Sequence, residues 1–134
     1  RWYKKNSETY PLYNIKYATS KDGINWLRKG IVCIDYKNKN EHALARPFVM
    51  KENKLYRMWF SYKGLNYKIG YAESLDGLNW IRNDTKIKYK KSNLICDNVM
   101  QEYPFVLDHS DKLYMFYNGN NYGKDGICLA TLEK

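Results

Sequence analysis

The sequence predicts an all-β fold, a partial β-propeller of about two and a half four-stranded antiparallel blades. Aromatic residues make up 16% of the 134-residue chain, with 14 Tyr and 4 Trp, which is typical of strands rather than of a helical bundle. One long segment also occurs twice, and within each copy large side chains alternate with polar or small ones. Repeated units of four short strands are characteristic of propellers.

The repeat consists of two blocks. Residues 13–28 recur without a gap at residues 67–82, an offset of 67 − 13 = 54. Residues 45–50 recur at residues 102–107, an offset of 102 − 45 = 57, and residues 127–131 are a truncated third copy of the first block. These nearly constant offsets define one structural unit per period.

Each unit divides into four strands at turn signals. Tyr56, Met58 and Phe60 alternate with Arg57, Trp59 and Ser61, a period of two that predicts a strand rather than a helix. For the complete unit, the sequence predicts an inner strand at Arg46–Lys51, then Leu55–Tyr62, Lys68–Ser74 and an outer strand at Asn79–Asn83. The turn signals are Asp22-Gly23, Glu52-Asn53, Asp76-Gly77, Asp108 to Asp111 and Asn118 to Gly123.

The chain begins and ends inside a unit. Arg1-Trp2-Tyr3 resembles the second-strand block Met58-Trp59-Phe60, and the chain ends on a third-strand block. We therefore interpret the chain as one propeller segment with a partial blade at 1–30, a full blade at 45–83 and a partial blade at 102–134. Since a propeller needs at least four blades, we expect missing blades or a second copy of the chain as partners. Unpaired strand edges favour association or poor solubility.

Charge and hydropathy narrow the range of functions. The net charge is 23 − 14 = +9, but lysines alternate with apolar residues over residues 86–90, which is typical of a solvated strand face. The sequence has no zinc finger, GXXG loop or aromatic RNA-binding block. An anion- or nucleic-acid-binding role is therefore less favoured than a carbohydrate-related one. No segment is apolar enough to span a membrane, and no signal peptide is visible. The chain opens on Arg1 without an initiator Met, so we expect an incomplete N-terminus.

The three cysteines, Cys33, Cys96 and Cys128, are odd in number, far apart in sequence and without a CxxC motif. This pattern predicts neither a disulfide framework nor a metal site. We expect small half-buried thiols in a reducing compartment, which favours a cytoplasmic protein. No motif in the sequence predicts a cofactor or a metal.

Two segments resemble a known superfamily. Met58-Trp59-Phe60-Ser61 and Ile69 through Trp80 are similar to the blades of five-bladed propeller glycoside hydrolases, and residues 102–106 and 113–120 also fit these relatives. The superfamily includes the arabinanase/β-xylosidase, β-fructosidase and mannoside-phosphorylase groups (families 43, 32 and 130), and the blade form is most like its uncharacterised bacterial members. The resemblance implies a carbohydrate ligand and, if the chain is an enzyme, a glycosidase or glycoside phosphorylase.

The segments Ser20 to Trp26 and Ser74 to Trp80 also resemble the Asp-box of sialidases. We interpret Asp22 and Asp76 as structural, because a carboxylate can accept backbone N–H groups across the turn while Gly supplies a positive φ. The Trp would then cover the hairpin. We expect both Trp residues to be largely buried in equivalent positions.

The resemblance places the chemistry on the inner strands. A glycosidase needs an acid and a base or nucleophile about 5 to 10 Å apart. Related enzymes carry these carboxylates in short motifs ending in Pro, and Glu102-Tyr103-Pro104 matches the general-acid motif. In related enzymes the motif of the preceding blade contains an aspartate, but here the segment is Ala45-Arg46-Pro47. This departure from the family pattern argues against classical hydrolysis. The resemblance assigns the base or nucleophile to an upstream blade.

Each candidate residue also has an alternative structural role. Glu102 is the candidate general acid, but a carboxylate at a strand start can also cap a loop or pair with lysine. Arg46 can bind a substrate carboxylate or phosphate, or pair with Glu102, which would lower the pKa of Glu102 and favour binding over proton donation. Tyr103 and Tyr62 can stack on sugar rings or pack in the core, and Asp97 lies in a loop expected to reach the funnel mouth.

Trp59 is a weaker candidate for stacking on a sugar ring, and Asn98 lies in the same loop as Asp97. His42 and His109 are expected at the surface. The function predicted first is a glycoside hydrolase-like protein or fragment that acts on or binds an oligosaccharide. The alternative is a carbohydrate-binding or structural propeller fragment without catalysis.

Overall fold

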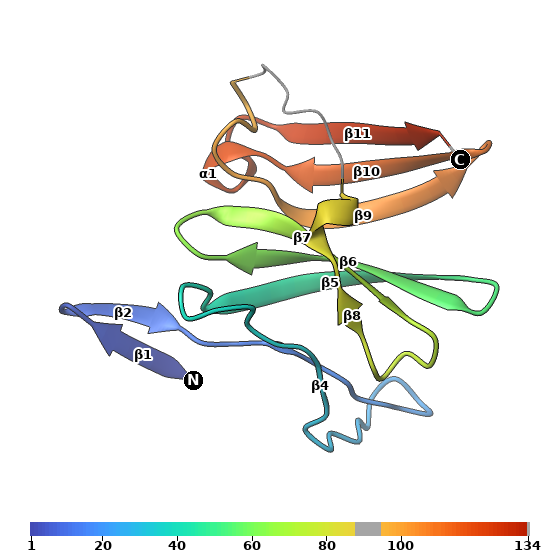
Figure 1. Cartoon of the computed structure of the whole chain (residues 1–134), viewed down its shortest axis with the longest axis horizontal. Coiled ribbons are helices and arrows are strands. Elements are labelled where there is room, and N and C mark those ends of the chain that lie inside the picture. The colour runs from blue at the N-terminus through green and yellow to red at the C-terminus, as the bar shows by residue number, and fades with distance from the viewer. Residues whose placement is uncertain (88–94, 134) are drawn as a thin grey trace.

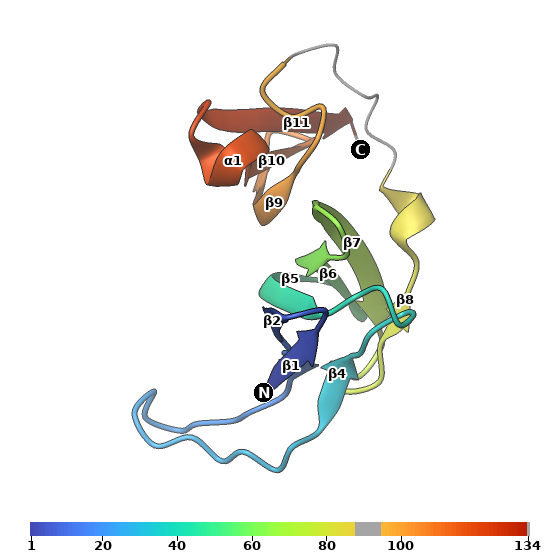
Figure 2. The ribbon, with the colours of Figure 1, turned by 90° about the vertical axis from the view of Figure 1, so that its left-hand side faces the viewer.

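The computed structural model describes residues 1–87 and 95–133. The regular elements are almost all antiparallel strands, grouped in four small sheets, three of which follow one another from β4 through the central sheet to β11 (Figures 1 and 2). The predicted all-β, partial-propeller fold class is confirmed. The strands are β1 (Trp2–Lys5), β2 (Glu8–Pro11), β3 (Ile15–Lys16), β4 (Val32–Ile34), β5 (Ala43–Glu52), β6 (Leu55–Lys63), β7 (Tyr67–Ser74), β8 (Ile81–Arg82), β9 (Glu102–His109), β10 (Lys112–Asn118) and β11 (Ile127–Glu133).

The central sheet is the complete unit that the sequence predicts. Its strands lie in the order β5-β6-β7-β8, and all neighbours are antiparallel. The first three strands match the predicted ranges to within three residues, whereas the outer strand covers only Ile81–Arg82. After it, the 3-10 turn η1 (Asp84–Lys86) brings Asp84 back to the sheet, where its carboxylate accepts the Tyr71 N–H at 3.2 Å.

The N-terminal region differs from the prediction that Arg1-Trp2-Tyr3 belongs to the second strand of a blade. Trp2 pairs with Pro11, in a hairpin of β1 with β2, rather than with residues of the first repeated block. Asn6 and Ser7 both have positive φ (50° and 66°), which is the requirement of a two-residue hairpin turn. This local turn closes the chain on itself before the repeat begins.

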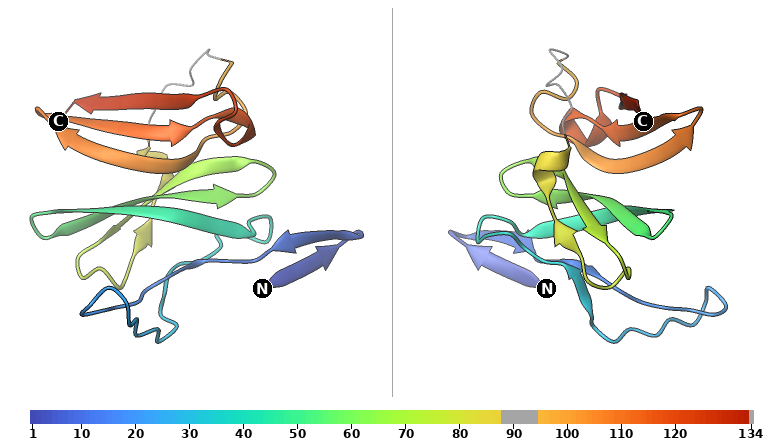
Figure 3. Two further views of the ribbon diagram at one scale, coloured as in Figure 1. Left: turned by 180° about the vertical axis from the view of Figure 1, so that it is seen from behind. Right: turned by 45° about the vertical axis from the view of Figure 1, so that its right-hand side comes forward.

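Apolar side chains fill the spaces between neighbouring sheets. One buried cluster lies between the central sheet and the C-terminal sheet of β9, β10 and β11, and another lies between the central sheet and the β3–β4 pair. Phe60, fully buried, is at the centre of the second cluster. A Cβ added at Gly70 would lie 2.5 Å from Phe60 Cζ, so the ring fits only because position 70 has no side chain. The β3–β4 pair, the central sheet and the C-terminal sheet are thus packed one on the next, and the β1–β2 hairpin projects to one side (Figure 3).

The two Asp-Gly turns have the same hydrogen bonds. Asp22 accepts the backbone N–H groups of Ile24 and Asn25 at 2.9 and 2.8 Å, and Asp76 accepts the equivalent N–H groups, both at 2.8 Å. These bonds hold the pKa of both carboxyls well below the ordinary range. Both Asp residues therefore act within their own turn, as expected.

The expectation that both Trp residues are largely buried is wrong. Trp26 and Trp80 each donate from Nε1 to the turn Gly carbonyl, at 3.1 and 3.0 Å, so their local geometry is equivalent. However, Trp26 is 49% exposed, whereas Trp80 is half-buried against Tyr56. The difference arises because Trp80 packs against the apolar cluster between the central sheet and the β3–β4 pair, whereas Trp26 belongs to neither of the two apolar clusters.

Among the described residues, no helix is long and apolar enough to cross a membrane. In the same part of the chain, no group of three or more His, Cys, Asp or Glu side chains is arranged to hold a metal ion.

Candidate functional site

The candidate site is built around the first residue of β9. Glu102 is fully buried and pairs with Asn118 of β10. The next residue, Tyr103, has φ +56°, and its N–H donates to Ser61 Oγ of β6 at 2.7 Å. This hydrogen bond fastens the start of the C-terminal sheet to the central sheet and fixes the position of the Glu102 carboxyl.

The start of β5 has the same backbone irregularity one unit earlier. Arg46 has φ +50°, and the pairing register of β5 breaks between Ala45 and Phe48, as the register of β9 with β10 breaks beside Tyr103. The exposed Arg46 guanidinium lies over the Tyr103 ring, 5.4 Å from its centroid. The structure therefore brings Arg46, Tyr103 and Glu102 to one place, at the end of the sheets where β5 and β9 begin (Figure 1).

Three further tyrosines and a lysine lie beside Tyr103. The Tyr67 ring lies 6.0 Å from that of Tyr103 and 6.1 Å from that of Tyr122, and its hydroxyl is 2.9 Å from the Tyr13 hydroxyl. Lys63 Nζ is 5.1 Å from the Tyr67 ring centroid and donates to the Tyr122 hydroxyl at 3.2 Å. We call Tyr13, Tyr67, Tyr103 and Tyr122 the tyrosine cluster.

Different elements contribute the tyrosine cluster. Tyr67 begins β7 and is only 4% exposed, whereas Tyr122 belongs to the single turn α1 (Asn120–Gly123) and is 55% exposed. Figure 1 shows α1, the turn between β6 and β7 and the start of β9 at the same side of the molecule. The tyrosine cluster therefore has a buried base and an exposed outer edge.

The environment of Glu102 raises the pKa of its carboxyl to about 7. The dominant cause is burial, which disfavours the charged form, and the positive charge of Lys63 opposes it. Neither Glu102 carboxyl oxygen has a hydrogen-bond partner among the described residues. The expectation that Arg46 keeps this carboxyl ionised is wrong, because Arg46 lies over the Tyr103 ring and burial has the larger effect.

Two other predicted site residues lie elsewhere. Tyr62 follows Ser61 on β6 and so faces the opposite side of the central sheet, where the Arg82 guanidinium lies 4.7 Å from its ring centroid. Asp97 is buried, and its Oδ2 accepts the Tyr117 hydroxyl at 2.6 Å, beneath the C-terminal sheet. The structure does not bring either residue into the tyrosine cluster.

The structure also places the weaker candidates Trp59, His42 and His109 outside the tyrosine cluster. Trp59 packs in the apolar cluster between the central and C-terminal sheets. The His42 ring nitrogens lie 3.3 and 3.2 Å from the carbonyl oxygens of Pro11 and Gly64, so this half-buried ring ties two segments together rather than lying free at the surface. His109 is exposed, as predicted.

Sequence reasoning did not single out Lys63, Tyr67, Tyr122 or Tyr13 as site residues. One signal was present, because Tyr13 and Tyr67 are equivalent positions of the first repeated block, at the offset of 54, and their hydroxyls meet. Nothing in the sequence alone indicates that α1 brings Tyr122 to the same place.

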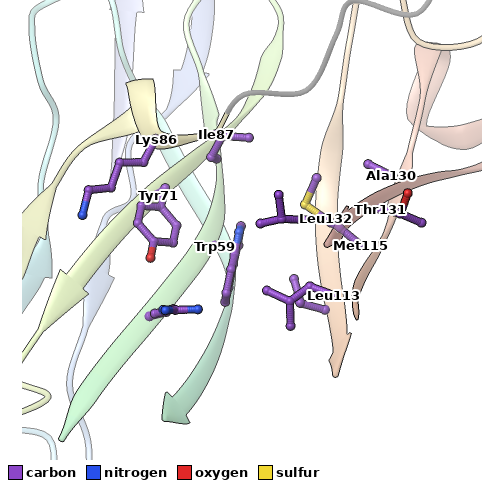
Figure 4. Close-up of a pocket in the computed structure, with 11 residues that line it drawn as sticks. Trp59, Tyr71, Lys86, Ile87, Leu113, Met115, Ala130, Thr131 and Leu132 are labelled. Carbon is purple, nitrogen blue, oxygen red and sulfur yellow. The ribbon is translucent and has the colours of Figure 1, made fainter. Parts of the chain in front are cut away.

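Two cavities are separate from this site. One, of about 410 Å³, lies between the central and C-terminal sheets and is lined mainly by apolar side chains, including Trp59, Leu113 and Met115 (Figure 4). Another, of about 330 Å³, lies beside Trp80 and Met58. Glu102 lines neither cavity.

No protein-family model matches the chain. Among curated proteins, it is 40% identical over 121 residues to the uncharacterized protein Rv1502 of Mycobacterium tuberculosis and, to the same extent, to the uncharacterized protein MT1551 from another strain of that organism. The match covers 89% of this chain but 40% of each relative, so the chain spans about two fifths of their length.

Two similar solved structures are a glycoside hydrolase and a BT0996 RGII complex. Both superpose with a TM-score of 0.65 at 21% sequence identity. The superposition covers 90% of this chain and 36% of each solved protein. The chain therefore has the fold of one part of a glycoside hydrolase structure.

Proposed function

We propose that the chain is part of a glycosidase-like protein, in which Glu102 exchanges a proton with the glycosidic oxygen of a bound oligosaccharide. The observation that carries the proposal is the buried Glu102 carboxyl, which has a pKa of about 7 and no hydrogen-bond partner among the described residues. A general acid has to be protonated near the working pH and free to donate. Most buried carboxyls have hydrogen-bond partners, so an unpartnered one calls for a functional explanation.

The surrounding side chains fit a sugar ligand. Aromatic rings present apolar faces of the size of a pyranose ring, and the tyrosine cluster supplies four rings within one small region. Lys63 and Arg46 add hydrogen-bond donors beside them. Because Glu102 is fully covered, the proposal includes a side-chain movement when the sugar binds, and Tyr122 is the most exposed ring of the cluster.

The proposal assigns the second carboxylate of the reaction to residues outside this chain. The equivalent inner-strand position of the preceding unit is Ala45, and the contacts of the tyrosine cluster include no other carboxylate among the described residues. Glycoside cleavage generally uses two carboxyl groups. We therefore expect weak or no turnover by the 134 residues alone, and activity from a longer protein that contains them.

The test compares wild type with Glu102→Gln, on the 134-residue chain and on the longest natural reading frame that contains it. The substrates are aryl glycosides and oligosaccharides, with and without phosphate. We expect Glu102→Gln to abolish turnover by the longer protein while oligosaccharide binding, measured by calorimetry, persists. Glu52→Gln, which alters an exposed carboxylate paired with Arg57 at 2.9 Å, is the matched control. Turnover that survives Glu102→Gln would remove Glu102 from the chemistry.

A non-catalytic carbohydrate-binding role is the second candidate, and Ala45 at the position equivalent to Glu102 favours it. Here Tyr122→Ala would weaken oligosaccharide binding in a protein that shows no turnover in either form. A binding series with heparin-like polymers and DNA separates both sugar roles from the anion-binding alternative. Steep salt dependence without binding of neutral sugars would support that alternative.

A further inference from the structure

Two of the three cysteines lie side by side, although the sequence separates them by 32 positions. The Cys128 thiol donates to Cys96 Sγ, with the two sulfurs 3.5 Å apart. Both thiols are free and half-buried, so a small reagent can reach them. Cys33 is also free but lies on β4, on the other side of the central sheet. The sequence pattern of distant, odd-numbered cysteines gave no indication of this pair.

The loop that carries Cys96 is tightly held. The Asn120 side chain donates to the Ile95 carbonyl at 2.6 Å and accepts the Met100 N–H at 2.8 Å, while the Asn120 N–H donates to the Cys96 carbonyl at 2.6 Å. A Cβ added at Gly119 would lie 2.1 Å from that same carbonyl oxygen. The close packing of this loop against the turn after β10 holds the Cys96 backbone beside the segment that leads to Cys128.

We propose that Cys96 and Cys128 form a redox-sensitive thiol pair that hydrogen peroxide converts into an intramolecular disulfide. Burial and the contact with Cys96 raise the pKa of Cys128, so Cys128 keeps its proton and donates it to Cys96 Sγ. We take Cys96, the acceptor of that bond, as the sulfur that attacks the peroxide. A disulfide requires the sulfurs to approach to about 2.05 Å, so the 3.5 Å separation has to shorten by roughly 1.5 Å.

The reaction balances with one peroxide. The Cys96 thiolate attacks one peroxide oxygen and breaks the O–O bond, which gives a sulfenic acid and hydroxide, and the hydroxide takes up a proton to become water. Cys128 sulfur then attacks the sulfenic sulfur, the S–S bond forms, and the sulfenic hydroxyl leaves with the Cys128 proton as a second water. The two sulfurs lose two electrons in total, and the two peroxide oxygens gain them.

The cross-link would join two segments that lead to different parts of the C-terminal sheet. Cys96 precedes β9 and its first residue Glu102 by a few positions, and Cys128 is the second residue of the edge strand β11. Oxidation would therefore tie the edge strand to the loop that enters the inner strand. This consequence does not depend on the glycosidase proposal.

The test treats the folded chain with hydrogen peroxide, then labels the remaining thiols under denaturing conditions and maps the cross-linked peptides by mass spectrometry. We expect a Cys96–Cys128 linkage with Cys33 still labelled, and a Tm increase of roughly 10 °C that dithiothreitol reverses. Cys33→Ser should behave as wild type, whereas Cys96→Ser and Cys128→Ser should form no intramolecular cross-link. Peptide mapping of wild type alone is decisive if a variant fails to fold. Retention of all three thiols, oxidation of Cys33 at the same rate, or linkage only between chains would overturn the proposal.

Discussion

The inner strands of the central and C-terminal sheets begin with the same backbone but different chemistry. Arg46 and Tyr103, related by the offset of 57, both have positive φ, and a Pro follows each. The residue before each differs, since Ala45 is half-buried and neutral whereas Glu102 is a fully buried carboxyl. The repeat thus specifies where the strand bends, and one side chain at the bend decides whether the position can move a proton.

The same comparison applies to the buried aromatic positions of β6 and β10. Phe60 and Tyr117 are also related by the offset of 57, and both are buried. Phe60 lies in an apolar cluster with the Arg82 guanidinium 5.1 Å from its ring centroid, whereas the Tyr117 hydroxyl donates to Asp97. Packing is therefore repeated, while the polar contact is particular to the C-terminal sheet.

The largest effect is expected from Phe60→Ala. Removing a fully buried ring leaves a cavity against Gly70, and we expect the free energy of unfolding to fall by about 3 to 5 kcal/mol. Urea denaturation measures the change. Val49→Ala, on the 45% exposed side chain of the neighbouring strand, is the control and should cost less than about 1 kcal/mol. Equal losses for both variants would show that the second apolar cluster is not the core of the central sheet.

The second prediction tests the buried carboxyl through pH. The pKa of Glu102 is about 7 in the fold against 4.5 ordinarily, so the folded state holds the proton more tightly than the unfolded chain. The contribution of Glu102 to folding is therefore most favourable below pH 4.5 and becomes unfavourable as the pH rises through 7. We expect the free energy of unfolding of Glu102→Gln, minus that of wild type, to increase by about 3 kcal/mol between about pH 4.5 and about pH 8.

Urea titrations at several pH values measure this difference, with Glu52→Gln as the control for loss of an exposed carboxylate. A difference that stays constant over this range would contradict the elevated pKa. Ala45→Glu extends the comparison, because a second carboxyl at the equivalent bend should produce a similar pH dependence only if its surroundings are equally dry.

The third prediction contrasts the two Asp-Gly turns. We expect Trp80→Ala to lower the free energy of unfolding by about 2 kcal/mol, since the half-buried Trp80 ring packs against Tyr56 and the second apolar cluster. Trp26→Ala should cost less than about 1 kcal/mol, because the ring is 49% exposed. Thermal unfolding of both variants gives the comparison. If Trp26→Ala were as costly as Trp80→Ala, the region between β3 and β4 would contain packing that the structure does not show.

The smallest effect is expected from Tyr117→Phe. This change keeps the ring but removes the hydroxyl that donates to buried Asp97, and an unsatisfied buried acceptor costs about 1 kcal/mol or somewhat more. Tyr114→Phe, on the same strand, is the control. If both variants retain wild-type stability, the Asp97 contact contributes nothing to the C-terminal sheet.

The strands of the central sheet could be predicted from sequence because alternation and turn residues are local signals. The N-terminal hairpin could not, because the positive φ of Asn6 and Ser7 determines its pairing and no periodicity reports it. Glu102 could be located by its motif, but its elevated pKa depends on burial, which the linear sequence does not encode. The Cys96–Cys128 pair was also beyond prediction, since it depends on a close approach at Gly119. The blade boundaries and the roles of the site residues remain predictions.

The cavity of about 410 Å³ between the central and C-terminal sheets has a mechanical consequence (Figure 4). The cavity is partly open to solvent, so along this stretch the two sheets lack the side-chain contacts that fill a closed core. Trp59 on one side and Leu113 and Met115 on the other line this space with apolar surface that attracts little water. A force that pulls the chain apart should therefore separate these two sheets before it breaks the backbone hydrogen bonds within either one.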